Sequence, residues 1–436
     1  MRGANARLAI LFAVLFLVYA FLRVAPNLQA ISRPREPADT TAYLRISTRP
    51  LFDVEFWGSA RPFVFPLLLK ITRQDVSAAA AVQLGFSILA WGLLALSVSA
   101  SLRTPWLKPF AFALILALGL VRHLASWDFV MMTESLSVSF FVLFLACGIW
   151  LIHGWRADKV IVLLLISLFL AFTRDTNAYL LLMLAGLLLI AVIFRWAQPR
   201  VLILIASFAV IFLLNNSNAE ISRRWLFPLT NLIGQRVLPK GEAITFFESC
   251  GMPVTPELIN LTGEFANANE RAFFNDPALS GFRAWLGEHG KSCYMRWLFT
   301  NPVQSVSESL REFENLVAFD KIDFLFSRRY EPLLPWRAER LLYPIHFTVI
   351  LWLILTLAAL IAVWKQAWKT NPLWSVFILL CLPILPHLFI TWHGDAMAPE
   401  RHALSVGLQL ALSFWILLFL LADHFLHRSP AENKST

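Results

Sequence analysis

The sequence predicts an all-α protein that crosses a lipid bilayer repeatedly, and three observations support this prediction. Of the 436 residues, 58% are hydrophobic and only 15% are charged, whereas soluble chains average about 25% charged residues. Apolar runs of the length that a spanning helix needs recur along the chain. Basic residues concentrate on alternate connections between these runs, as they do in cytoplasmic loops. The net charge of +9 therefore indicates loops that face lipid headgroups. We expect no nucleic-acid partner, because the basic residues form no continuous stripe.

About ten apolar runs are predicted to span the bilayer, and the basic connections between them are assigned to the cytoplasm. The runs cover residues 8–24, 78–102, 109–121, 130–152, 160–173, 178–194, 201–214, 341–364, 372–391 and 403–425. An even number of spans places both termini in the cytoplasm. The first run follows Arg2 and Arg7 as in a signal peptide, but no convincing small-residue cleavage site follows it, so we interpret it as an uncleaved anchor.

Three regions follow from this pattern. Residues 1–214 form an N-terminal membrane module whose first outer loop, residues 25–77, contains the candidate catalytic acid. Residues 215–340 form a mainly helical extracytoplasmic loop domain, and residues 341–436 form the last membrane helices and a cytoplasmic tail.

The cysteines indicate the compartment of the large loop. Cys250 and Cys293 both lie in it, whereas Cys147 and Cys381 lie within apolar runs. A pair confined to one exported loop favours a disulfide in an oxidising compartment, the alternative being two unpaired buried thiols. Neither the spacing nor the neighbours of these residues suggest a zinc site.

Polar groups are expected to line a cavity near the outer membrane surface. The third, fifth and seventh runs have only about 13 to 14 apolar residues, roughly 20 Å of helix against about 30 Å of hydrocarbon. They end in Arg122-His123, Arg174-Asp175 and Asn215-Asn216. Either the bilayer thins locally, or these ends are recessed and face water and protein. The second interpretation predicts a polar site that is open to a lipid-bound molecule.

Acids and arginines from several outer connections are predicted to meet at this site. They include Asp39 and Arg61 in the first outer loop, Glu134 at the start of the fourth run, Arg174, and Glu400-Arg401-His402 before the last run. Three of these features also have a local explanation. Asp39 could cap a short interfacial helix, and Glu134 could interact with a helix dipole. Arg174 and Asp175 could form a local interfacial pair.

The order and spacing of these motifs resemble the GT-C superfamily of integral membrane glycosyltransferases. This group uses sugars carried on polyprenyl phosphates and includes the protein O-mannosyltransferases and the lipid A aminoarabinose transferases. The resemblance covers about the first 215 residues, while the later part matches only in layout. The chain departs from many relatives at His402, where they have Tyr, and its first-loop acid stands alone. The resembling segments are Asp39-Thr40-Thr41-Ala42-Tyr43-Leu44, Arg61-Pro62 with Pro66-Leu67-Leu68-Leu69, Thr133-Glu134-Ser135, Thr173-Arg174 and Glu400-Arg401-His402.

This resemblance implies a GT-C-like fold and an inverting glycosyl transfer. Asp39 would be the general base that removes the acceptor proton. Arg61, Arg174 and Arg401 would bind the donor phosphate, since a guanidinium can engage two oxygens at once.

The resemblance also implies the substrates and the location. Tyr43, Glu134 and His402 would contact the substrate. The partners would be a polyprenyl-phosphate-linked sugar donor and a glycan, lipid or protein acceptor. The expected location is a bacterial inner (plasma) membrane, with the active site on the outer face. Because phosphate is already a good leaving group, we expect no metal and no cofactor.

Two other classes of function remain open from the sequence. A transporter or flippase of lipid-linked sugars would use the same membrane body and basic cavity. Against it, we find no internal repeat and no pair of broken helices in matching halves. A non-catalytic subunit for assembly of envelope polysaccharide would tolerate the loss of Asp39.

Overall fold

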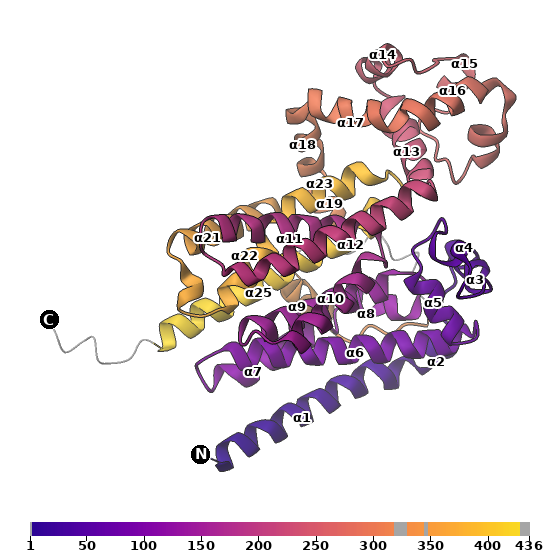
Figure 1. Cartoon of the computed structure of the whole chain (residues 1–436). Coiled ribbons are helices and arrows are strands. Elements are labelled where there is room, and N and C mark those ends of the chain that lie inside the picture. Colours follow the sequence, from indigo (N-terminus) through magenta and orange to yellow (C-terminus); the bar gives the residue numbers. More distant parts are fainter. Residues whose placement is uncertain (1, 318–328, 344–347, 428–436) are drawn as a thin grey trace.

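The computed structural model describes residues 2–317, 329–343 and 348–427, and this part of the chain is built from helices (Figure 1). Within it, the strand-like pairing consists of one isolated parallel bridge between Arg35 and Val130. The all-α fold class is therefore confirmed.

Seven of the described helices are long and apolar enough to cross a membrane, or eight if one bent pair counts as a single span. The bent pair joins Leu107–Leu118 to Arg122–Phe129 at an angle of 59°. The protein therefore sits in a lipid bilayer. The seven spans are Ala6–Ser32, Val76–Ser101, Glu134–Ile152, Asp175–Ile193, Pro199–Ile221, Leu373–Gly394 and Leu404–His427.

The difference from about ten predicted spans comes from short helices. Each predicted run contains a helix, but α10 (Ala157–Ala171) has 15 residues and α21 (Thr348–Trp364) has 17. One expectation about length was wrong. The seventh run is not short, because α12 (Leu202–Ile221) continues through the polar residues 215–218 instead of ending before them.

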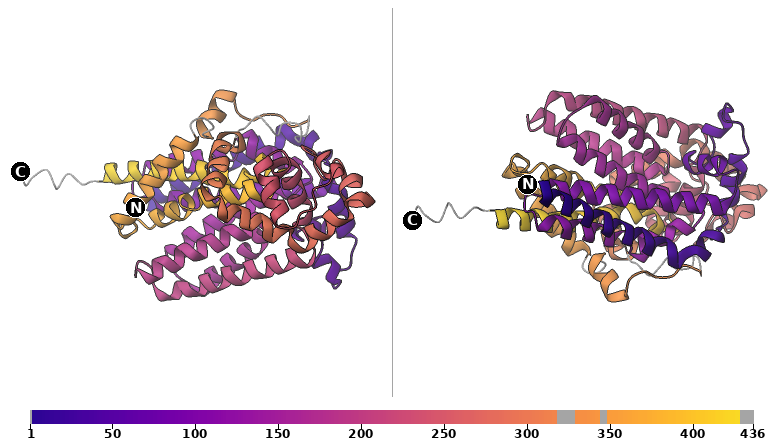
Figure 2. Two further views of the ribbon diagram at one scale, coloured as in Figure 1. Left: turned by 90° about the horizontal axis from the view of Figure 1, so that it is seen from above. Right: turned by 90° about the horizontal axis from the view of Figure 1, so that it is seen from below.

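The membrane helices form one elongated bundle. The start of α1 and the end of α25 lie at the same end, and the large loop lies at the opposite end (Figures 1 and 2). Helix α6 packs against α7 and α9, while α11 and α12 form an antiparallel hairpin. The bundle helices are α1 (Arg2–Val24), α2 (Leu28–Ser32), α6 (Val76–Ser101), α7 (Leu107–Leu118), α8 (Arg122–Ala125), α9 (Glu134–Ile152), α10, α11 (Asp175–Ile193), α12, α21, α22 (Leu373–Cys381), α23 (Ile384–Gly394) and α25 (Leu404–His427).

Short helices lie mainly at the end of the bundle where the large loop lies, while α20 lies along the bundle, where Trp415 of α25 donates to the Leu342 carbonyl (Figure 1). Helices α3 to α5 belong to the first loop, α13 to α19 belong to the large loop, and α24 lies between α23 and α25. They are α3 (Asp39–Ser47), α4 (Val54–Trp57), α5 (Val64–Ile71), α13 (Leu226–Leu232), η4 (Ile233–Val237), α14 (Gly241–Ser249), α15 (Pro256–Ile259), α16 (Ser280–Trp285), α17 (Lys291–Thr300), α18 (Pro302–Arg311), α19 (Phe313–Val317), α20 (Trp336–Leu342) and α24 (Pro399–His402).

Buried apolar side chains form two separate clusters. The larger cluster fills the bundle, and the smaller one comes mainly from residues 229–298. A disulfide joins Cys250 to Cys293 within this smaller unit, with their Cα atoms 6.1 Å apart. Cys147 and Cys381 are free and buried in the bundle. The large loop therefore has its own apolar core and its own covalent link.

Candidate functional site

The first outer loop is attached to the bundle by backbone contacts. The amide of Arg35 donates to the Phe129 carbonyl at 2.7 Å, and the Met131 amide donates to the Arg35 carbonyl at 2.8 Å. The Thr40 hydroxyl donates to the Met131 carbonyl at 2.9 Å. These bonds place the start of α3 directly beside the segment that leads into α9.

Asp39 is the first residue of α3, but its side chain does not cap that helix. The N-cap position is Ala38, which makes no side-chain hydrogen bond to the helix. The carboxylate of Asp39 instead receives Arg61 Nη2 at 2.7 Å and Arg401 Nη1 at 3.3 Å. The capping explanation for Asp39 was therefore wrong. This carboxylate joins the first outer loop to the segment that precedes α25.

Glu134 opens α9 and lies beneath this pair. Its Oε1 atom is 3.3 Å from both Arg174 Nη1 and Arg401 Nε, and its side chain is only 1% exposed. Its other oxygen, Oε2, is buried without a hydrogen-bond partner. Glu134 can therefore hold two arginines and still accept a hydrogen bond from a substrate hydroxyl.

Arg174 connects this network to a histidine and a third acid. Its Nη2 atom lies 2.6 Å from His402 Nδ1, and its Nη1 atom donates to the Arg401 carbonyl at 3.0 Å. His402 Nε2 lies 3.8 Å from Asp395 Oδ2. Arg174 and its neighbour Asp175 thus point toward different partners, which argues against a purely local pair.

His402 is held in its neutral form. Burial, together with the positive charges of Arg174, Arg401 and Arg61, lowers the pKa of His402 well below its usual value. A neutral ring that accepts from Arg174 at Nδ1 carries its proton on Nε2, which faces Asp395. Burial in turn raises the pKa of Asp395.

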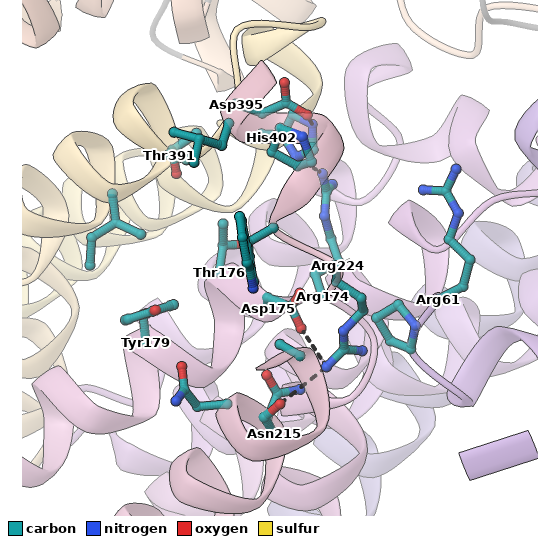
Figure 3. A pocket seen from close by; sticks show the side chains of 18 of the residues that line it. Arg61, Arg174, Asp175, Thr176, Tyr179, Asn215, Arg224, Thr391, Asp395 and His402 are labelled. Carbon is teal, nitrogen blue, oxygen red and sulfur yellow. Dashed lines mark hydrogen bonds and ion pairs between the residues drawn. The ribbon is translucent and has the colours of Figure 1, made fainter. Parts of the chain in front are cut away.

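These side chains, apart from that of Asp39, border a cavity of about 340 Å³ at the end of the bundle where the large loop lies (Figure 3). Its wall includes Arg61 and Arg401, the two arginines that hold Asp39, as well as Glu134 and Tyr43. The guanidinium of Arg61 lies over the Tyr43 ring, 5.6 Å from its centre. All seven residues predicted to form the site, Asp39, Tyr43, Arg61, Glu134, Arg174, Arg401 and His402, therefore belong to one network or to the cavity wall.

Arg224 is a cavity residue that the sequence interpretation missed. Its Nη2 atom lies 3.2 Å from Asp175 Oδ1 and donates to the Asn215 carbonyl at 3.1 Å (Figure 3). Its side chain is only 4% exposed, yet Nε and Nη1 are buried without a hydrogen-bond partner. Arg224 can therefore offer two further donors to an anion. Because Arg224 follows the polar pair Asn215-Asn216 closely in the sequence, it could have been predicted to line the same cavity.

The site combines acids and arginines in nearly equal number. Around Asp39, the carboxylates of Asp39 and Glu134 face three guanidiniums, and Asp395 lies beside the neutral His402 as a third acid. Arg224 and Asp175 balance each other across the cavity. The arrangement combines a partly exposed carboxylate with several cations. Proton abstraction from a hydroxyl and stabilisation of a departing phosphate need these groups.

No protein-family model matches this chain, and no curated protein matches it significantly. Among the described residues, no group of three or more His, Cys, Asp and Glu side chains is placed to hold a metal ion. The function is therefore inferred from the geometry of the cavity and from the sequence motifs whose residues form it.

Proposed function

We propose that this protein is a GT-C-like glycosyltransferase that moves a sugar from a polyprenyl-phosphate donor to an acceptor on the outer face of the membrane. The observation that supports this most is the position of Asp39. Its carboxylate lies between Arg61 and Arg401, and both arginines border a cavity at the end of a membrane bundle. This arrangement supports the proposal because Asp39 could act as the base while the arginines beside it bind a lipid phosphate.

In the proposed reaction, an acceptor hydroxyl attacks the anomeric carbon while Asp39 takes its proton. The bond between that carbon and the phosphate oxygen breaks, and polyprenyl phosphate leaves with the electron pair. The arginines stabilise the charge that develops on the phosphate. Arg61 and Arg401 lie closest to Asp39, and Arg174 and Arg224 add donors deeper in the wall. The free oxygen of Glu134 would bind a hydroxyl of the sugar.

The proposed topology has both termini in the cytoplasm of a bacterial cell and the large loop outside. It is supported by basic residues on alternate connections and by the start of α1 and the end of α25, which lie at the same end of the bundle (Figure 2). Cysteines introduced at Ala268, an exposed residue of the large loop, and at Ala431 should react with a membrane-impermeant reagent from opposite sides. Labelling of both from one side would contradict this topology.

Sugar transfer by the purified protein tests the function directly. The protein in detergent is given a panel of polyprenyl-phosphate sugars, and release of polyprenyl phosphate is measured with envelope glycans and glycolipids as acceptors. Mass spectrometry of the same glycans from a deletion strain should show one missing sugar, which identifies the donor to use. Transport of the lipid-linked sugar across vesicles without release of polyprenyl phosphate would instead favour a carrier.

A further inference from the structure

A second cavity lies between the large loop and the segment that follows α23. Its volume is about 1,140 Å³, larger than the roughly 300–1,000 Å³ of ordinary small-molecule pockets. The lining comes from η4, the start of α14, helix α18 and residues 392–400. This size and the number of contributing segments suit an extended ligand rather than a small metabolite.

The two cavities share one wall, formed by residues 392–402. His393, Asp395 and Arg401 border the first cavity, while Trp392 and Glu400 border the second. The same wall carries Arg401, which pairs with Asp39 at 3.3 Å. A ligand in the second cavity would therefore lie directly behind the segment that holds the proposed base.

The shared wall also contains a strained backbone position. Ala398 has a φ of 45°, in the left-handed region that residues with a Cβ atom rarely adopt. Such strained positions concentrate at binding and switching segments. Ala398 lies between Ala396 and Pro399, which both border the second cavity.

The side chains that line the second cavity indicate the chemistry of its ligand. Three cations (Arg236, Lys240 and Arg311) face four acids (Glu242, Glu308, Glu312 and Glu400). This near balance does not suit a strongly charged chain of either sign. The amides of Gln235, Asn301 and Gln304 add both donors and acceptors. A neutral polyhydroxylated chain fits this lining, since each of its hydroxyls both donates and accepts.

Part of this lining is held in place by bonds between its own side chains. Gln304 Nε2 donates to Glu242 Oε1 at 3.1 Å and to Glu308 Oε1 at 3.2 Å. Lys240 Nζ lies 2.6 Å from Glu308 Oε1. These bonds join α18 to the start of α14, so polar groups on two helices keep a fixed spacing. Fixed donors and acceptors reduce the ordering cost of binding.

We infer that the second cavity binds the acceptor and that the acceptor is a neutral glycan chain. This inference rests on the proposed transferase function and narrows it to one acceptor class. The chain would lie in the groove of the large loop and present its terminal hydroxyl past the shared wall toward Asp39. The donor would reach the first cavity from the bilayer, so the two substrates would approach from different sides.

The test measures binding of defined hexasaccharides to the full-length protein in detergent. Three neutral chains (maltohexaose, chitohexaose and mannohexaose) are compared with hexagalacturonate as an acidic chain. Gln304→Trp should fill the groove and weaken binding of the best neutral chain at least about tenfold, or about 1.4 kcal/mol. Val306→Trp is the matched control, because Val306 lies on the same helix, is 36% exposed and does not line the groove. It should leave binding unchanged.

Several results would overturn this inference. They are no binding by any neutral chain, tighter binding of hexagalacturonate, and equal losses in Gln304→Trp and Val306→Trp. A thermal unfolding curve for each variant shows whether Gln304→Trp is still folded. If it is not, Gln304→Ala is tested in its place, and this variant must also bind the neutral chain more weakly. Hexasaccharide binding should persist in Asp39→Asn. If the wild-type protein binds the hexasaccharide but transfers no sugar, the proposed function fails while the glycan site stands. The two failures can therefore be told apart.

Discussion

Two arginine–carboxylate clusters lie near the end of the bundle that carries the large loop, and they differ in how completely they are enclosed. Arg23 of α1 pairs with Asp128 of η2 (Ser126–Phe129), and their side chains are only 1% and 2% exposed. Arg23 also donates to the Tyr19 hydroxyl at 2.7 Å and to the Gly119 carbonyl at 2.6 Å. By contrast, the side chains of Arg61 and Asp39 are 34% and 20% exposed.

This difference separates a structural role from a chemical one. The buried pair ties α1 to α7 and η2, and Ser135 of α9 donates to Asp128 at 2.6 Å. It therefore supports the start of α9, where the neighbouring Glu134 enters the candidate site. The open cluster borders a cavity and keeps unsatisfied polar atoms. Mutations in the first cluster should change stability, and mutations in the second should change turnover or binding.

The largest expected effect is on turnover in Asp39→Asn. The amide keeps the size of the carboxylate but cannot take the acceptor proton, and a positioned general base contributes about 10²–10⁴-fold. We expect sugar transfer to fall by about this factor, while the thermal unfolding curve and binding of farnesyl phosphate, a short polyprenyl phosphate, stay close to wild type.

Asp53→Asn is the matched control for this substitution. Asp53 lies in the same outer loop and caps α4 by accepting from the Glu55 amide at 2.9 Å. Asn caps a helix about as well as Asp, so this variant should remain fully active. A folded Asp39→Asn enzyme with turnover near wild type would remove Asp39 from the reaction.

The next largest effect is on stability, in Asp128→Ala. Removing one partner of a buried ion pair costs about 3–5 kcal/mol, because the other charge is left without compensation. We expect a lower unfolding midpoint in detergent. The double variant Arg23→Met/Asp128→Leu should recover much of this loss, since an apolar pair removes both buried charges. Equal destabilisation by the single and double variants would contradict this explanation.

The helices could be predicted from the sequence, because long apolar runs have few alternatives in a bilayer. The site residues could be found for a related reason. Glu134 and Arg174 stand beside apolar segments where charge is costly, so each requires an explanation, whereas Asp39 was found from the motif that it shares with Thr40 and Tyr43 in the first loop.

The buried pair of Arg23 and Asp128, and the second cavity, could not be predicted from the pattern of apolar runs. Arg23 and Asp128 are 105 residues apart, and no spacing rule pairs them. Arg224 was missed because asparagine and serine have modest helix propensity, so α12 was predicted to end too early. The groove forms only when four distant segments pack together.

A smaller effect on stability is expected from the loop disulfide. Opening a link between residues 43 positions apart removes a constraint worth about 2–4 kcal/mol. Cys250→Ser/Cys293→Ser should lower the unfolding midpoint of the large loop without abolishing donor binding in the first cavity. Thiol alkylation of the untreated protein should spare both cysteines, and Cys293→Ser should make Cys250 reactive. Alkylation of both in the wild-type protein would show that they are unpaired.

The smallest effect, and the one that tests the open cluster most specifically, is on donor binding in Arg61→Ala. Arg61 contributes a charge that would meet the phosphate both before and during the reaction, so its loss should weaken binding as well as lower the rate. A hydrogen bond to a charged group is worth about 1.5–3 kcal/mol. Because Arg61 is partly exposed to solvent, we expect its contribution to phosphate binding to lie near the lower value. We expect farnesyl phosphate to bind about tenfold more weakly, with a matching fall in kcat/KM. Arg73→Ala is the control, because Arg73 lies on the same outer loop and does not border the cavity. If Arg61→Ala bound farnesyl phosphate as tightly as wild type, Arg61 would serve only to hold Asp39. The phosphate would then have to be bound by the deeper arginines, Arg174 and Arg224.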